Sequence, residues 1–306
     1  MKVKTIVKHL LRKVINPKTF FMLIRIKRNK KKKKDHVYVD PYLKAYSNIF
    51  PGESLHFPFF SNPEIIPEDI SLLDIKDGGI AYANLVIDKI IDKEAPVLDV
   101  GCGLGGLCKL LASNGYKPVG LTPDHFQYTY IKEKHPEIEI IKSKFEDIDC
   151  KHYNHYFGTV INAESLQYLK LDDVFPIIDA ILMPGGHWIV CDYFRKEESF
   201  KQQHYWDEFI NRIGDMKWEI LSQQDITKNV LPFLAFSYMF SKRLFLPLID
   251  FFVDNLQEKK PGVYHLVEDS VHLLKSDIIN RLRYIDPEIF SQERKYMLLV
   301  IKNVER

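Results

Sequence analysis

The sequence predicts an α/β fold with a mainly parallel sheet, and three observations support this prediction. Between about residues 95 and 200, apolar segments of strand length alternate with segments of helix length, the pattern of a layered α/β fold. A glycine-rich stretch, VLDVGCGLGG at residues 97–106, contains the end of the first strand. The chain has 306 residues, 46% hydrophobic and 27% charged, enough for one large domain with its own core or for one domain with a substantial appendage.

The predicted elements follow one another in a regular order. Strands are expected at residues 95–100, 117–122, 138–141, 156–162, 187–194 and 296–303. Helices are expected at residues 80–91, 171–182, and after the first and second strands as far as about Asn114 and Lys134. Pro184, Gly185 and Gly186 predict a tight turn before the fifth strand. Residues 199–285 are predicted to be mainly helical.

The first 34 residues differ sharply in charge from the rest of the chain. They contain fourteen Lys or Arg and no Asp or Glu, and leave 29 basic and 41 acidic side chains elsewhere. Residues 2–15 predict a basic amphipathic helix, so we expect residues 1–34 to bind an anionic membrane surface. The alternatives are a disordered basic tail and a nucleic-acid or nuclear-localisation patch. No nucleic acid is expected, because no aromatic residues interleave the lysine run.

The cysteines and the hydropathy pattern indicate the cellular setting. Cys102, Cys108, Cys150 and Cys191 form no C-x-x-C pair, so no metal site is expected and the thiols read as reduced. No run of 18 uncharged apolar residues occurs, so no transmembrane helix is predicted. We therefore expect a cytoplasmic protein with its basic head on a membrane surface.

The glycine-rich stretch carries the strongest functional signal. Gly101, Gly103 and Gly106 fit the spacing of a dinucleotide loop, but Asp99 lies two residues before the first glycine. A carboxylate there would repel the pyrophosphate that such a loop binds at a helix N-terminus. It suits a ligand with positive charge instead. S-adenosyl-L-methionine (SAM) carries an ammonium and a sulfonium and has no phosphate.

Asp99 to Gly105 also resembles the D-x-G-x-G-x-G motif of class I SAM-dependent methyltransferases. The stretch GLTPDHFQ, with Gly120, Thr122 and Gln127, is similar to the G-x-T-x-S-x-x-Q pattern of one branch, with Asp124 in place of serine. That branch includes cyclopropane fatty-acid synthases, tocopherol and sterol C-methyltransferases and glycine/sarcosine N-methyltransferases. The resemblance covers roughly residues 55–192.

The resemblance implies a Rossmann-like class I methyltransferase sheet, mainly parallel with an antiparallel last strand. It also implies a helical N-terminal extension and a helical acceptor lid. The domains expected are a basic head at residues 1–39 and a methyltransferase domain at 40–306, in which 199–285 is an acceptor-binding insertion. SAM is the implied cofactor. The cofactor-binding residues implied are Asp99, Gly101, Cys102, Gly103, Gly105, Thr122, Gln127, Phe145, Glu146 and Ala163.

The same resemblance places three residues around the transferred methyl group, namely His56, Glu164 and Tyr168. A base is needed only if the acceptor loses a proton as it attacks. The alternative for Glu164 is a surface carboxylate, for His56 a packing or capping histidine, and for Tyr168 a core tyrosine. Besides Asp124, the sequence departs from the family pattern at Pro58, Lys144, Gln167 and Tyr168.

The expected function is methyl transfer to a small hydrophobic or lipid-like acceptor. The segment at residues 229–256 is rich in phenylalanine, which favours a lipophilic acceptor channel or the core of a helical subdomain. One alternative is a cyclopropane-type lipid synthase, disfavoured because the segment INAESLQYL has no cysteine. Another is a non-catalytic SAM-binding scaffold held at a membrane.

Overall fold

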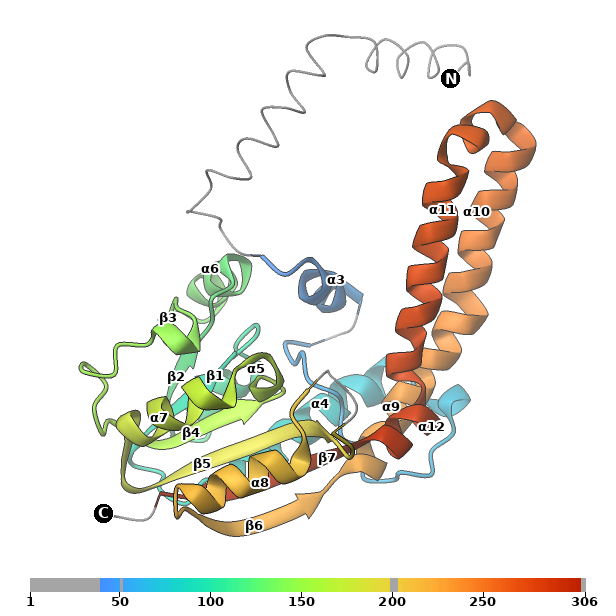
Figure 1. Cartoon of the computed structure of the whole chain (residues 1–306). Coiled ribbons are helices and arrows are strands. Elements are labelled where there is room, and N and C mark those ends of the chain that lie inside the picture. The colour runs from blue at the N-terminus through green and yellow to red at the C-terminus, as the bar shows by residue number, and fades with distance from the viewer. Residues whose placement is uncertain (1–38, 50–51, 199–202, 304–306) are drawn as a thin grey trace. The chain divides into compact units, whose positions relative to one another are not determined.

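The computed structural model in Figure 1 describes residues 39–49, 52–198 and 203–303. The basic head predicted at residues 1–34 lies outside this range. The described chain divides into two compact units, one formed by residues 39–238 and 284–303 and the other by 239–283.

The larger unit is built on a seven-stranded sheet with the strand order β3-β2-β1-β4-β5-β7-β6 (Figure 1). The first five strands run parallel, while β7 pairs antiparallel with both β5 and β6. The strands are β1 Pro96–Val100, β2 Lys117–Leu121, β3 Glu139–Ile141, β4 Phe157–Ala163, β5 Leu182–Arg195, β6 Glu219–Asp225 and β7 Arg294–Lys302. The predicted Rossmann-like sheet with an antiparallel last strand is confirmed.

Alternate residues of the central strands belong to two separate hydrophobic clusters, which explains the apolar character of these strands. In β1, Val97 packs with α4, α5, α9 and α12, whereas Leu98 and Val100 pack with α7 and α8. The helices of this unit are α3 Pro41–Ile49, α4 Leu72–Ile87, α5 Gly106–Ser113, α6 His125–Lys134, α7 Leu171–Ile181, α8 Trp206–Asp215, α9 Thr227–Phe240 and α12 Pro287–Glu293.

Three local features differ from the sequence predictions. The segment predicted as mainly helical contains β6, an edge strand whose polar residues Ser222–Asp225 hide the apolar signal of a strand. Helix α4 begins at Leu72 rather than near residue 80, because Ser71 and Asp74 form a capping box. The turn predicted at Pro184 lies inside β5, where the register with β4 shifts.

The smaller unit is a pair of antiparallel helices (Figure 1). A π-helix at Ser241–Phe245 leads into α10 Leu246–Lys259, and α11 Pro261–Leu282 returns along it. The Lys275 Nζ atom lies 2.5 Å from Asp250 Oδ1 and joins the two helices. The aromatic cluster predicted for an acceptor channel is divided: Phe233 packs in the larger unit, and Phe252 is exposed on α10.

Among the described helices, none combines the length and hydropathy needed to cross a membrane.

Candidate active site

The glycine loop follows β1 at the point where the order of the strands reverses, which is where open α/β sheets bind ligands. Gly101, Gly103 and Gly105 have positive φ angles of 76°, 56° and 83°, a conformation that other residues rarely adopt. A Cβ atom on Gly101 would lie 2.8 Å from the Ser165 Cβ atom. The Gly101 N–H donates to the Leu121 carbonyl at 2.8 Å, which fixes the start of the loop against β2.

Asp99 presents a buried carboxyl group beneath this loop. The residue is 1% exposed, its Oδ2 atom accepts from the Cys108 thiol at 3.4 Å, and its Oδ1 atom has no hydrogen-bond partner. Burial raises the pKa of Asp99 to about 7, although the Cys108 contact lowers it. A buried carboxylate oxygen without a partner is costly, and a cation would compensate it. The site therefore fits the positively charged methionine end of SAM.

The tip of β2 and the start of α6 form the next part of the predicted cofactor site. Thr122 and Gln127 are both buried, and the Thr122 hydroxyl donates to Gln127 Oε1 at 2.7 Å. Asp124 is the N-cap of α6 and accepts from the backbone N–H groups of Phe126 at 2.7 Å and Gln127 at 3.1 Å. Capping explains why aspartate can replace the serine of the family pattern here.

The other predicted cofactor residues lie at or near the carboxyl ends of neighbouring strands. Cys102 is buried in the loop after β1, Ala163 ends β4, and Phe145 is buried in a short helical turn after β3. Glu146 is exposed on that turn. The structure places Cys102, Ala163 and Phe145 at this edge of the sheet, while the Glu146 side chain is exposed; their contact with the cofactor stays a prediction.

Glu164 follows β4 and has an unusual backbone conformation. Its φ angle is 51°, uncommon for a residue other than glycine. Its Oε1 atom accepts from the Phe57 N–H at 2.5 Å and from the Tyr296 hydroxyl at 2.7 Å. Burial raises the pKa of Glu164 to about 8, these two hydrogen bonds oppose the rise, and Asp192 adds to it. A carboxyl group that ionises near neutral pH can act as a base.

A second buried carboxyl group, Asp192, lies near Glu164. It is 1% exposed on β5 and accepts from the backbone N–H groups of Gln167 at 3.1 Å and Tyr193 at 2.8 Å. Burial raises the pKa of Asp192 to about 7, although these backbone bonds lower it. Sequence reasoning did not single out Asp192 or Tyr296. The only available signal was a polar or hydroxyl-bearing residue within an otherwise apolar strand.

His56 and Tyr168, the other two predicted catalytic residues, lie in different surroundings. The His56 ring stacks on Tyr82 at 4.9 Å and hydrogen-bonds the Ala163 backbone. Burial lowers the pKa of His56 to about 4, although that hydrogen bond raises it, so the imidazole is neutral at pH 7. Tyr168 is 75% exposed, so its side chain lies at the surface and not in the enclosed region around Glu164.

An aromatic cluster surrounds the Glu164 hydrogen bonds, and Phe57 is its centre. The Phe57 ring centroid lies 5.9 Å from Tyr193, 5.8 Å from Phe233, and 6.4 Å from both Phe290 and Tyr296. Phe233 comes from the phenylalanine-rich segment at residues 229–256, but the other rings come from segments far apart in the sequence, so the cluster as a whole could not be predicted from any one segment. Within the described residues, no group of three or more His, Cys, Asp or Glu could hold a metal.

The comparisons with known proteins agree with this arrangement. A family described as "Methyltransferase domain" matches residues 97–186. An uncharacterized methyltransferase of Alkaliphilus oremlandii is 24% identical over 165 residues, covering 51% of this chain and 75% of the relative. The sterol 4-C-methyltransferase strm-1 of Caenorhabditis elegans is 31% identical over 115 residues, covering 35% of this chain and 34% of the relative. The chain thus spans about a third of that sterol methyltransferase.

Solved structures show the same fold. The geranyl diphosphate C-methyltransferase from Streptomyces coelicolor, in complex with Mg²⁺, geranyl diphosphate and S-adenosyl-L-homocysteine (SAH), superposes with a TM-score of 0.58 at 14% identity. The match covers 87% of this chain and 94% of that enzyme. Together with the family match and the methyltransferase relatives, the sheet and its glycine loop identify the chain as a class I SAM-dependent methyltransferase.

Proposed function

We propose that the enzyme transfers a methyl group to a small hydrophobic, lipid-like acceptor at a membrane surface. The observation that carries this proposal is the position of Glu164. Its carboxyl group has a pKa raised to about 8 by burial. It accepts hydrogen bonds from the Phe57 N–H and the Tyr296 hydroxyl, and both residues belong to the aromatic cluster around Phe57. An acid–base group among aromatic rings suits an apolar acceptor that carries one ionisable or polar atom.

In the proposed reaction, SAM would supply the methyl group while held by Asp99, the glycine loop, Thr122 and Gln127. The hydrogen bonds of Tyr296 and Phe57 both end on Oε1 of Glu164. Oε2 is therefore the atom of Glu164 that we expect to take a proton from the acceptor. The neutral imidazole of His56, stacked on Tyr82, would orient the acceptor without adding charge. Positioning of this kind accounts for much of the rate enhancement of such transfers.

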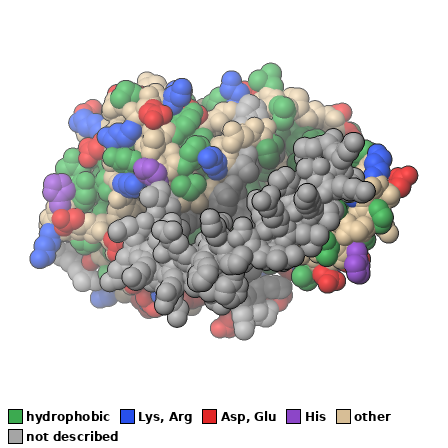
Figure 2. Space-filling view, turned by 90° about the horizontal axis from the view of Figure 1, so that it is seen from above, with side chains coloured by type: hydrophobic (Ala, Val, Ile, Leu, Met, Phe, Trp, Pro, Cys, Tyr) green, Lys and Arg blue, Asp and Glu red, His purple; other side chains and the backbone are tan. Residues whose placement is uncertain are grey.

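Further observations support a lipid-like acceptor and a membrane surface. The sterol methyltransferase relative is named for a lipid acceptor, and residues 1–34 carry fourteen basic and no acidic side chains. The smaller unit also exposes large apolar side chains along both helices: Leu244, Phe245, Leu248, Phe251, Phe252, Leu266, Leu273, Leu274 and Ile279. On the face seen in Figure 2, hydrophobic side chains lie exposed among acidic and basic ones. Apolar surface beside lysines suits an anionic lipid surface.

The isotopic content of the product tests the proposed reaction. The full-length enzyme is incubated with SAM whose transferred methyl carries only deuterium, and with the organic-soluble fraction of a cell extract. Methyl transfer keeps all three deuterium atoms in a lipophilic product, which is the result we expect. Retention of two deuterium atoms would show cyclopropane-type chemistry instead, and SAM binding without any labelled product would contradict an enzymatic role.

A further inference from the structure

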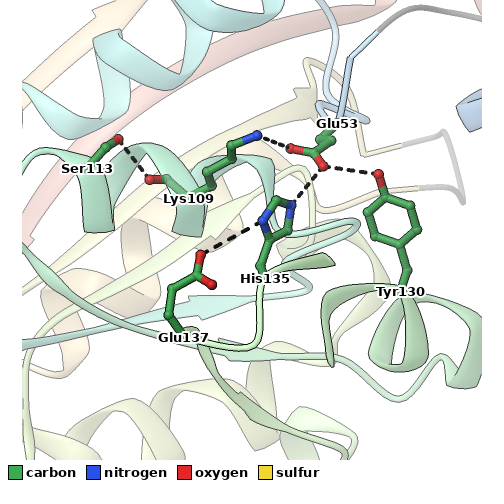
Figure 3. Close-up of polar contacts among 6 residues, drawn as sticks. All are labelled: Glu53, Lys109, Ser113, Tyr130, His135 and Glu137. Carbon is green, nitrogen blue, oxygen red and sulfur yellow. Dashed lines mark hydrogen bonds and ion pairs between the residues drawn. The ribbon is translucent and has the colours of Figure 1, made fainter. Parts of the chain in front are cut away.

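Glu53 is the centre of a polar cluster that joins the segment between α3 and α4 to the helices α5 and α6 (Figure 3). Its Oε1 atom lies 2.7 Å from His135 Nε2 and accepts from the Tyr130 hydroxyl at 3.0 Å, and its Oε2 atom lies 3.0 Å from Lys109 Nζ. On the other side of the imidazole, His135 Nδ1 lies 3.9 Å from Glu137 Oε1. Burial opposes the Glu53 charge, but the hydrogen bonds outweigh burial and lower the pKa of Glu53.

The partners of Glu53 belong to the two helices that flank the cofactor loop. Lys109 is in α5, which begins at Gly106, while Tyr130 is in α6 and His135 caps its C-terminal end. The ring of His135 also lies close to Gly105, whose Cβ would come within 3.9 Å of the imidazole. One carboxylate therefore links both helices and the loop between β1 and α5.

Residues 53–60, which we call the strap, pack closely against glycines of the cofactor loop and of the helices α5 and α4. A Cβ atom on Gly106 would lie 2.9 Å from the Glu53 backbone, and one on Gly103 would lie 3.2 Å from Leu55. On α4, a Cβ on Gly79 would lie 3.0 Å from Ser54, and one on Gly78 would lie 2.8 Å from Pro58. The glycines of the cofactor loop and the glycine pair in α4 thus allow the strap to lie against both.

The far end of the strap reaches the catalytic carboxyl group. His56 hydrogen-bonds the Ala163 backbone, and the Phe57 N–H donates to Glu164 Oε1 at 2.5 Å. Beyond it, the Phe59 N–H donates to the Gly78 carbonyl at 3.0 Å. A single continuous segment therefore contacts the cofactor loop at Glu53 and positions the proposed base at Phe57.

The contacts of the strap between its two ends are incomplete. The Ser54 hydroxyl oxygen is buried and has no hydrogen-bond partner. A pocket of about 390 Å³ lies beside the strap, lined by Gly52–Ser54, His56 and Pro58 together with residues of α4 and α5. Close packing normally leaves no such space. The aromatic end of the strap, from Phe57 to Phe60, is thus anchored in the core and by backbone hydrogen bonds, whereas the end beside the pocket is anchored by the polar contacts of Glu53.

We propose that Glu53 is a positioning residue that clamps the strap over the glycine loop and so controls the release of SAM and SAH. While the clamp is closed, the strap covers the backbone of the cofactor loop and holds the Phe57 N–H against Glu164. Opening at Glu53 frees the loop and lets the cofactor exchange. This inference depends on the cofactor and is independent of the acceptor proposed above.

The test is the dissociation rate of SAH from the full-length Glu53→Gln variant, measured by displacement with excess SAM and without any acceptor. The substitution keeps the shape of the side chain and removes its charge. SAH should leave about tenfold faster or more, the ratio expected for the loss of one charge-assisted hydrogen bond. In the same variant, hydrogen exchange at the Phe57 and Phe59 amides should be faster, while amides of β4 and β5 should keep their protection.

Two further variants make the outcome decisive. Lys109→Met removes one partner of Glu53 and should also make SAH release faster. This second variant tests the same contact if Glu53→Gln folds poorly. Glu94→Gln removes an exposed ion pair with Lys117, in which the charged atoms lie 3.7 Å apart, and should change neither the release rate nor exchange in the strap. SAH release within twofold of the unmodified enzyme in the Glu53 and Lys109 variants would overturn the proposal, whatever their thermal stability.

Discussion

The Tyr296 hydroxyl lies 2.7 Å from Oε1 of Glu164. This contact joins the last strand of the sheet to the residue that follows β4, across 132 positions of sequence. Tyr296 also lies 3.1 Å from the Tyr82 hydroxyl, which donates to the Cys191 carbonyl at 3.1 Å. The proposed base is therefore one end of a hydrogen-bonded series contributed by β4, β7 and α4.

Glu164→Gln should keep SAM binding and lose turnover. The amide keeps the shape of the side chain but cannot take a proton, so the rate should fall by about 10²- to 10⁴-fold, the usual contribution of a general base. Calorimetry with SAM and single-turnover kinetics check the two halves of this expectation. Equal rates in the two enzymes would remove Glu164 from the chemistry.

The same substitution should raise stability at alkaline pH. The pKa of Glu164 in the folded state, about 8, lies above its ordinary value of 4.5, so the folded state binds the proton more tightly than the unfolded state. The free energy of unfolding should therefore fall as pH rises from about 4.5 to 8, and the whole loss should be present above pH 8. Denaturant unfolding at pH 5 and pH 9 measures the free energy of unfolding. The Glu164→Gln variant should be more stable than the unmodified enzyme at pH 9 and should have no such advantage at pH 5.

Tyr296→Phe should move the pH profile of the reaction upward. The hydroxyl of Tyr296 stabilises the ionised form of Glu164, so its removal should raise the pKa of Glu164 beyond about 8. Tyr82→Phe is the matched control, because Tyr82 does not contact the carboxyl group directly and should shift the profile less. The rate measured between pH 6 and 10 distinguishes the variants. Identical profiles for both would show that the hydrogen bond does not tune the base.

Asp99→Asn should weaken SAM binding and abolish its pH dependence between pH 6 and 7. The pKa of Asp99 is raised to about 7 by burial, so a cationic ligand should favour its ionised form and bind more tightly as pH rises through this range. Removing the charge should cost about 10- to 100-fold in affinity, the value of one charge-assisted hydrogen bond. Calorimetry in two buffers should detect a proton released on binding to the unmodified enzyme only.

The basic head should bind anionic vesicles. Full-length protein should sediment with them, and a form that begins at Asp35 should not, because residues 1–34 hold the excess of positive charge. Higher salt should weaken the binding, since the Debye length falls from about 10 Å at 0.1 M to about 3 Å at 1 M.

A matched control compares two full-length variants that lose the same number of lysines. Changing the lysines of residues 30–34 to glutamine should reduce sedimentation, whereas changing five exposed lysines of the larger unit should not: Lys93, Lys132, Lys134, Lys151 and Lys217. Equal sedimentation of the two variants would contradict a role for the head.

The sheet and the cofactor loop could be predicted from the sequence because each depends on local pattern. Buried parallel strands give continuous apolar segments, and a tight loop with positive φ needs glycine at Gly101 and Gly103. Strand β6 could not be predicted in this way. It is an edge strand with polar residues, so its burial alternates without an apolar run.

The proposed acceptor site was harder to predict, because its parts come together only through folding. Glu164 and His56 were chosen by resemblance to a family, and Phe233 lies in the phenylalanine-rich segment at residues 229–256. Tyr296 and Asp192 come from segments that carry no local functional signal. Glu53 was missed for the same reason: its partners lie 56 to 82 residues away. Long-range contacts of this kind require the structure.

The central claim is that this enzyme methylates a lipid-like acceptor through Glu164. The measurement that tests it most directly follows labelled methyl from SAM into the organic and the aqueous fractions of a cell extract, with the full-length enzyme and its Glu164→Gln variant side by side. We predict label in the organic fraction with the unmodified enzyme and little or none with the variant. Label confined to water-soluble products, or equal labelling by both proteins, would contradict the account.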